Sequence, residues 1–313
     1  MIVYKKLDEI IYDKKTVLTL GTFDGVHLGH RVIIDRLKKT AAENNLRELI
    51  ITMEPHPQVV LNKPDKGPIR LLTTIEERLQ LFEELGIQNC FVLEFNREIA
   101  NMDAEQFVEQ VMVKTIGVDK ILMGYDHLFG KNRGGNEELL KKLGLKFNFS
   151  VERIEGYEKD GIFVSSTKIR RALDEKRIDD ANKMLGYYYF IIGEVVHGVG
   201  RGRKIGYPTA NIKIENQYKL IPPVGVYFVS SNIKNRKVFG MANIGYRPTF
   251  DDNMGLVLEV YFFDIEEDLY GKRQKIEFHN YLRDEKKFNG VEELIEAMKE
   301  DERICRELIK KLF

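Results

Sequence analysis

The chain has 313 residues, 43% of them hydrophobic, so it is long enough for two domains with ordinary buried cores. Its 49 Lys and Arg residues equal its 49 Asp and Glu residues, so no overall basic field would draw it to nucleic acid or to an anionic membrane. The two cysteines, Cys90 and Cys305, belong to no Cys/His cluster, and we see neither a signal peptide nor a long apolar stretch; these features argue against structural zinc and predict a reducing, cytoplasmic location.

The first informative segment is a strand, a glycine-bearing turn and a helix. Residues 17–20 are an apolar run typical of a buried strand, and residues 21–30 read GTFDGVHLGH. The helix that follows repeats apolar residues on one face: Leu28, Val32, Ile33 and Leu37. This order predicts a phosphate site, because free backbone amides and the helix dipole both point at an anion.

A histidine pair strengthens that prediction. His27 and His30 are three residues apart, so they lie on the same side of the first helical turn, where both imidazoles can reach one phosphate. A surface histidine pair beside a tight turn is the alternative. Because Gly25 and Gly29 surround the pair and a strand precedes it, we favour nucleotide binding.

The first half alternates strands and helices. Further strand-like runs occur at residues 49–53, 90–95, 120–123 and 147–154. Thr74 followed by Glu77 is typical of a helix start and Gly86 of its end, and a second helix follows Asp103. Alternation of this kind predicts a mainly parallel sheet with helices on both faces. Ligands of such sheets bind beyond the carboxyl ends of the strands, where residues 21–30 would lie.

Two more motifs extend the first site. His56 stands between Pro55 and Pro57 after the second strand, where it could approach a flavin or a nucleotide; a rigid surface turn is the alternative. Residues 165–170 read SSTKIR, in which hydroxyls and amides at a helix start, with Arg170 one turn later, suit a triphosphate. A helix cap with a solvated basic face is the alternative there.

The pattern changes near residue 186, after a charged helical stretch at 174–185. Strands separated by turns are predicted at residues 224–230, 237–243, 256–265 and 273–282. They indicate an all-β domain, a barrel with Greek-key-like connections. Leu294, Met298 and Leu308 recur at helical spacing in residues 291–312, so we expect this tail to pack across the barrel as a helix.

Residues 198–211 form a glycine-rich basic run that ends in PTAN. The chain contains no Walker A pattern, so this is not a P-loop kinase site. Gly198 and its neighbouring glycines allow backbone amides to approach phosphate, and Lys204 adds a positive charge. Thr209 and Asn211 offer the hard oxygen ligands that suit phosphate-bound magnesium. A mobile loop is the alternative for a Gly/Arg run taken alone.

Glu259 lies in an otherwise apolar segment, residues 256–264. Strand alternation places it on one face with Val257 and Tyr261. A carboxylate in so apolar a strand needs a partner or a task. A salt-bridged glutamate on a solvent face is the alternative.

These motifs together resemble one family. GTFDGVHLGH resembles the HxGH signature of nucleotidyltransferases and, more specifically, the N-terminal module of bacterial bifunctional riboflavin kinase/FAD synthetases. SSTKIR is similar to that family's second phosphate motif, and the run ending in PTAN to its riboflavin kinase signature. The resemblance implies a Rossmann-like FMN adenylyltransferase domain over residues 1–185. It implies an all-β barrel riboflavin kinase domain with a C-terminal helix over residues 186–313.

The resemblance also implies the chemistry. Riboflavin would be phosphorylated to FMN, and FMN adenylylated to FAD with release of pyrophosphate; ATP would be the co-substrate of both steps and Mg²⁺ the metal. His27 and His30 would act at the α-phosphate, Arg170 on the leaving pyrophosphate, and Glu259 as base for the riboflavin hydroxyl. The nucleotide would be bound by Gly21, Phe23, Asp24, Gly25, Asp126, Ser165, Ser166, Thr167, Gly198 and Lys204. The flavin contacts would be His56, Asn243 and Arg283.

One departure and three alternatives stay open. Residues 124–130 resemble the family's GxDFxFG loop, but His127 stands where an aromatic Phe is more usual, which puts stacking there in doubt. A single-activity nucleotidyltransferase with a flavin-binding β domain, a class I aminoacyl-tRNA synthetase and a flavin-sensing regulator are the alternatives. Thr209, Asn211 and Glu259 argue against the first. The synthetase would need a basic surface for tRNA, which we do not see, and the two phosphate sites disfavour the regulator.

Overall fold

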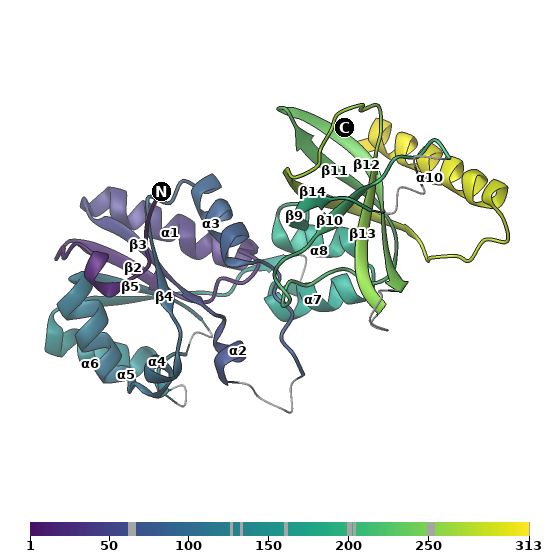
Figure 1. The fold of residues 1–313 in the computed structure, drawn as a ribbon. Coiled ribbons are helices and arrows are strands. Elements are labelled where there is room, and N and C mark those ends of the chain that lie inside the picture. Colours follow the sequence, from purple (N-terminus) through teal and green to yellow (C-terminus); the bar gives the residue numbers. More distant parts are fainter. Residues whose placement is uncertain are drawn as a thin grey trace. The chain divides into compact units, whose positions relative to one another are not determined.

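The structure is a computed structural model that describes residues 1–61, 67–125, 128–131, 134–159, 162–198, 202, 205–248 and 254–312. Its contacts divide the chain into two compact units, Met1–Ser166 and Thr167–Phe313, which we describe separately (Figure 1). By contacts, residues 167–185 belong with the second unit, whereas the sequence places the domain boundary after residue 185. The functional boundary at 185/186 stays a prediction.

The first unit contains a parallel sheet in the order β1-β4-β3-β2-β5-β6. Its strands are β1 (Ile2–Tyr4), β2 (Thr16–Leu20), β3 (Arg47–Glu54), β4 (Asn89–Glu94), β5 (Val118–Gly124) and β6 (Ser150–Ile154). The predicted parallel sheet is confirmed. Sequence analysis missed β1, and it began the last strand too early, because Phe147 ends a helix and Asn148 follows it at φ +60°.

Helices cover both faces of this sheet, as predicted (Figure 1). They are α1 (Leu28–Asn44), α2 (Pro57–Leu61), α3 (Ile75–Glu84), α4 (Arg97–Asn101), α5 (Ala104–Phe107), a π-helix (Val108–Ile116) and α6 (Glu137–Phe147). The predicted start of α3 is confirmed, since the Thr74 hydroxyl accepts from the Glu77 amide. The predicted inner face of α1 is partly wrong, because Ile34 and Leu37 are fully buried whereas Leu28 is only half-buried.

The order in which successive strands are added to the sheet reverses at β2. From β2 the strands proceed to β3 and β4 on one side, and β5 then pairs with the opposite side of β2. The residues after β2 therefore lie at the carboxyl edge of the sheet, at the point where the strand order switches. Open α/β sheets bind ligands at this point.

The second unit is a closed antiparallel barrel in the order β10-β13-β12-β11-β14-β9. Its strands are β9 (Phe190–Val196), β10 (Ala210–Lys213), β11 (Gly225–Ile233), β12 (Arg236–Pro248), β13 (Met254–Phe262) and β14 (Arg273–Arg283). The predicted all-β barrel is confirmed. Sequence analysis listed neither β9 nor β10, and the four residues of β10 are too few for a clear alternation.

The helices in the described part of the second unit include α7 (Ser166–Asp174), α8 (Ile178–Leu185) and α10 (Val291–Leu312). The single helix expected over 174–185 is wrong, because Lys176 at φ +61° separates α7 from α8. The tail forms α10 as predicted. Its Met298, Cys305 and Leu308 pack against Met241 and other apolar residues of the barrel.

Candidate functional sites

The loop after β2 has a strained backbone. Phe23 and Val26 adopt φ values of +48° and +36°, and Gly25 lies between them at +85°. Residues other than glycine rarely adopt positive φ, and such strain persists only where surrounding contacts impose it. Strained residues of this kind cluster at functional sites, which supports a functional role for the loop.

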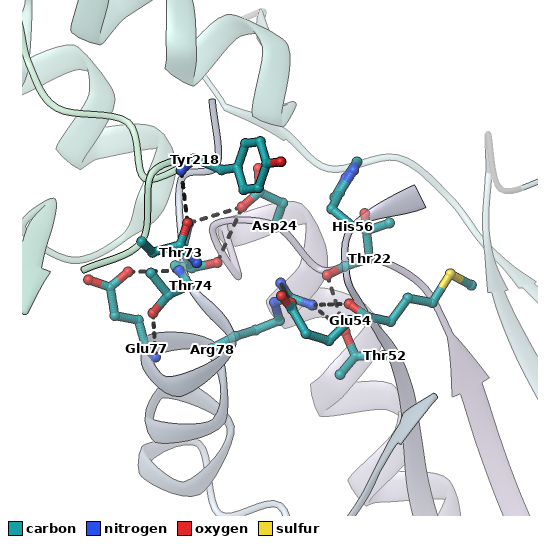
Figure 2. A network of polar contacts seen from close by, with 12 residues as sticks. Thr22, Asp24, Thr52, Glu54, His56, Thr73, Thr74, Glu77, Arg78 and Tyr218 are labelled. Atoms are coloured by element: carbon teal, nitrogen blue, oxygen red, sulfur yellow. Dashed lines mark hydrogen bonds and ion pairs between the residues drawn. The ribbon is translucent and has the colours of Figure 1, made fainter. Parts of the chain in front are cut away.

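Hydrogen bonds from the segment before α3 hold this loop (Figure 2). Asp24 is 1% exposed, and its carboxylate accepts from the Leu72 and Thr73 amides at 3.2 and 3.0 Å. The Gly25 amide donates to the Thr73 hydroxyl at 2.9 Å, and the Ser166 hydroxyl donates to the Asp24 carbonyl at 2.9 Å. Asp24 therefore fixes the shape of the loop, and its contact with a nucleotide stays a prediction.

The histidine pair is brought together as expected. The His27 and His30 rings stack with centroids 3.7 Å apart and planes 17° apart. Nδ1 of His27 accepts from the His30 amide at 3.4 Å, which leaves Nε2 of neutral His27 as a donor. A side chain at Gly29 would lie 3.2 Å from the His27 ring, so glycine leaves room for the stacked pair.

His30 is suited to donate a hydrogen bond as a neutral group. Burial lowers the pKa of His30 well below 6.5, and electrostatic interaction with His27 and Arg78 lowers it further. His30 is therefore uncharged near neutral pH. A neutral imidazole can donate to a phosphate oxygen without carrying a charge into a buried site.

Residues Ser165, Ser166 and Thr167 stand at the start of α7, and Arg170 lies one turn into that helix, half-buried. The predicted helix start is confirmed. Ser166 belongs to the first compact unit and Arg170 to the second. The approach of Arg170 to the histidine pair stays a prediction.

The structure describes some of the other residues predicted for the first site and not others. His56 is buried just after β3, and its Nδ1 accepts from the Gln58 amide at 3.2 Å. Its contact with a flavin stays a prediction, as do the nucleotide contacts of Gly21 and Phe23. Asp126 and His127 lie outside the described residues.

Sequence analysis missed Arg78, which is fully buried in α3 near the loop (Figure 2). A signal was available, because Arg78 shares the apolar face of the helix with Leu81 and Phe82 at positions i+3 and i+4. A charged residue on such a face needs buried partners.

In the barrel, register places the predicted kinase residues in one row. Glu259 of β13 is the direct partner of Asn211 on one neighbouring strand and of Asn243 on the other. Asn243 in turn pairs with Val226, and Val226 with Arg283. Directly paired residues share a face, with Cβ atoms about 4.5–5.5 Å apart. The closed barrel thus brings together residues that are far apart in the sequence.

This row lines a cavity of about 420 Å³ between the barrel and α10. The Thr209 hydroxyl lies 3.4 Å from a carboxylate oxygen of Glu259. A Cβ at Gly198 would lie only 2.1 Å from Nδ2 of Asn211, so a larger residue there would displace the Asn211 amide. Lys204, Val199 to Arg201 and Arg203 lie outside the described residues.

Arg283 has a partner that sequence analysis missed. Its Nε and Nη2 donate to the two carboxylate oxygens of buried Asp301 in α10, at 2.9 and 2.7 Å. This bidentate ion pair links the end of β14 to α10 beside the cavity. Asn243 donates from Nδ2 to Glu285 at 3.4 Å. Flavin contacts by Arg283 and Asn243 stay predictions.

Comparison with known proteins places both halves of the chain. Residues 10–168 match the FAD synthetase family model, and residues 185–309 match the riboflavin kinase family model. In the described parts of the chain, no helix combines the length and the apolarity needed to cross a bilayer.

Full-length relatives extend the match. The chain is 38% identical to a bifunctional riboflavin kinase/FMN adenylyltransferase of Listeria monocytogenes, covering 96% of this chain and 94% of the relative. A Bacillus subtilis relative with the same description is 38% identical, over 92% of this chain and 90% of the relative.

A Streptococcus pneumoniae crystal structure, described as a macrolide-efflux protein, is also similar, with a TM-score of 0.86 and 31% identity over 97% of this chain and 98% of that one. The two family models and the relatives agree with one another. The chain belongs to the family of bifunctional riboflavin kinase/FMN adenylyltransferases.

Proposed function

We propose that residues 186–313 phosphorylate riboflavin and that residues 1–185 adenylylate the resulting FMN, each in its own site. The observation that carries the kinase assignment is the row in which Asn211, Glu259 and Asn243 are direct neighbours. The strained loop with the stacked histidine pair supports the second assignment.

In the kinase reaction, Glu259 is the base. It takes the proton from the 5′-hydroxyl of riboflavin as that oxygen attacks the γ-phosphorus of ATP; the bond from the γ-phosphorus to the bridging oxygen breaks, and ADP leaves. Positioning by the cavity and proton removal by the carboxylate are the contributions of the chain. Thr209 beside Glu259 orients that carboxylate through its hydroxyl.

Magnesium fits the kinase site. Thr209 and Asn211 present a hydroxyl and an amide, which are hard oxygen donors, and Mg²⁺ commonly binds few protein ligands together with phosphates and water. Among the described residues, no cluster of three His, Cys, Asp or Glu side chains offers an alternative metal site. When bound, the ion would neutralise charge on the phosphates of ATP.

In the adenylyl transfer, a phosphate oxygen of FMN attacks the α-phosphorus of ATP, and pyrophosphate leaves as the bond to the bridging oxygen breaks. The chain needs no covalent nucleophile. His27 and His30 donate hydrogen bonds to the α-phosphate, where negative charge increases in the transition state. Arg170, with the hydroxyls and amides of residues 165–167, binds the leaving pyrophosphate.

Reciprocal substitutions test the two-site proposal. Glu259→Gln keeps the shape of the side chain but removes the base, so FMN formation should fall by roughly 10²–10⁴-fold while added FMN is still converted to FAD. His30→Ala removes a transition-state contact worth about 3 kcal/mol, so FAD formation should fall about a hundredfold with FMN formation unchanged.

Each variant is assayed once with riboflavin and once with FMN, in the presence of Mg-ATP, and the flavins are separated by chromatography. A thermal melt checks that each variant folds. If both substitutions depress both reactions equally in folded protein, one shared site carries the chemistry and the proposal is wrong.

A further inference from the structure

Arg78 is the one large charged side chain of α3 that is 0% exposed, and Figure 2 shows it near Thr22 and Asp24 of the loop after β2. Its Nη1 donates to the Thr52 hydroxyl at 2.7 Å and to the Met53 carbonyl at 3.1 Å. Its Nη2 lies 3.6 Å from a carboxylate oxygen of Glu54. One guanidinium therefore holds three successive residues at the carboxyl end of β3.

Thr52 passes this contact on to the phosphate loop. The Thr52 hydroxyl accepts from Arg78 and donates to the Thr22 carbonyl at 3.2 Å. Thr22 precedes Phe23, the first residue of the loop with positive φ. The chain of contacts Arg78–Thr52–Thr22 thus reaches from α3 across the end of β3 to the strained backbone.

The positive charge of Arg78 also faces two nearby carboxylates. Asp24 and Glu54 are the carboxylates whose charges act on it most strongly. The buried cation offsets their negative charge. Burial raises the pKa of Glu54, and the charge of Arg78 opposes that rise.

The pairing of Arg78 is incomplete. Among the described groups, Nε of Arg78 has no partner within hydrogen-bond distance, and Nη2 of Arg78 and Oε2 of Glu54 meet only as an ion pair at 3.6 Å. A buried guanidinium with an unmade hydrogen bond costs stability, so a structural role alone does not account for it. A function in the adenylyl-transfer site would account for its presence.

We infer that Arg78 is a positioning residue for adenylyl transfer: through Thr52 it fixes the Thr22 carbonyl and the loop that carries His27 and His30, and its charge offsets Asp24 and Glu54 for the incoming phosphates. The inference rests on the proposed function of the first domain. It adds a residue that contacts no substrate and acts through the loop.

Four variants of the full chain test this inference. Arg78→Met removes both charge and hydrogen bonds; it should raise the KM for ATP, lower kcat, and reduce kcat/KM for FAD formation roughly a hundredfold, because misplacing reacting groups by about 1 Å costs that much. Arg78→Lys keeps the charge and should recover activity to within about tenfold of the unmodified chain. Thr52→Val breaks only the link to Thr22, and should lower kcat/KM about tenfold.

Thr40→Val is the matched control. Thr40 is buried in α1, and its hydroxyl has no hydrogen-bond partner among the described groups, so this variant removes a comparable hydroxyl outside the network. It should leave FAD formation within about twofold. FMN formation, measured on the same samples, should stay constant in all four variants and calibrates the amount of active chain.

The possible outcomes are distinct. A merely structural Arg78 would reduce the amount of folded first domain and lower kcat with an unchanged KM for ATP, which would overturn the inference. FAD formation by Thr52→Val equal to that by Thr40→Val would also overturn it, even where Arg78→Met fails to fold. If the unmodified chain makes FMN but no FAD, the proposed function of the first domain itself fails, and the inference falls with it.

Discussion

Glu152 joins the helix that carries the histidine pair to the edge of the sheet. Its carboxylate accepts from Nε and Nη2 of Arg36 in α1 at 2.6 and 3.1 Å, and Nζ of Lys120 in β5 lies 2.7 Å away. Glu152 itself is in β6 and is 26% exposed. Replacing it with Gln removes the charge that both cations face, with little change of shape.

The size of the effect follows from the pKa of this carboxyl. The hydrogen bond from Arg36, together with Lys120, lowers its pKa from 4.5 to about 2. That difference corresponds to about 3 kcal/mol of folding free energy at pH 7. Because the carboxylate is partly solvated, we expect Glu152→Gln to lower the free energy of unfolding by ~1–2 kcal/mol.

The pH dependence has a definite sign. The folded pKa is depressed, so the unfolded chain binds the proton first as the pH falls. The stabilisation is therefore complete above about pH 4.5 and is lost as the pH falls from 4.5 towards 2. The difference between Glu152→Gln and the unmodified chain should shrink by more than half between pH 7 and pH 3.

Hydrogen exchange of peptides from β5 and β6 at pH 7 measures the change in this domain, and thermal melts at pH 7 and pH 3 measure its pH dependence. Glu155→Gln is the matched control, since Glu155 is exposed and lies three residues further on. Equal free energies of unfolding for Glu152→Gln and Glu155→Gln at pH 7 would refute the stabilisation that we assign to the ion pairs of Glu152.

Two further predictions concern the second unit. A fragment of residues 167–313 should phosphorylate riboflavin and melt at a higher temperature than residues 186–313, because Asn182 donates to a carbonyl of β14 at 2.9 Å and is lost from the shorter fragment. Equal melting temperatures would contradict this. Burial and the charge of Lys237 lower the pKa of His279 from 6.5 to about 3. Since the unfolded chain then binds the proton first, this unit should lose stability as the pH falls from 6.5 towards 3, and NMR titration should find His279 neutral at pH 5.

The parts of the fold that sequence analysis predicted are those with a local cause. The Thr74–Glu77 capping pair, the alternation of strands and helices, and the spacing of His27 and His30 all act within a few residues. Such signals survive in the chain whatever its tertiary context. The turn at Lys176 was missed because a positive φ at a lysine leaves no mark in the composition.

The assembly of the sites has a different cause, which the sequence does not display. Asn211, Glu259 and Asn243 are adjacent only because of the register of β10, β13 and β12, and one-residue slips would move them to opposite faces. Their motifs were visible, but their contact depends on a barrel that closes over distant segments.

The structure also separates two roles within a motif. Asp24 uses its carboxylate on Thr73 and its neighbour, and Arg283 uses its guanidinium on Asp301. Both were predicted to bind ligand. In each predicted site a charged residue holds a loop or strand end in place, and the substrate contacts of its neighbours stay predictions. A motif therefore identifies the site more surely than it identifies which of its residues touch the ligand, because the same residue type serves both to shape a site and to bind in it.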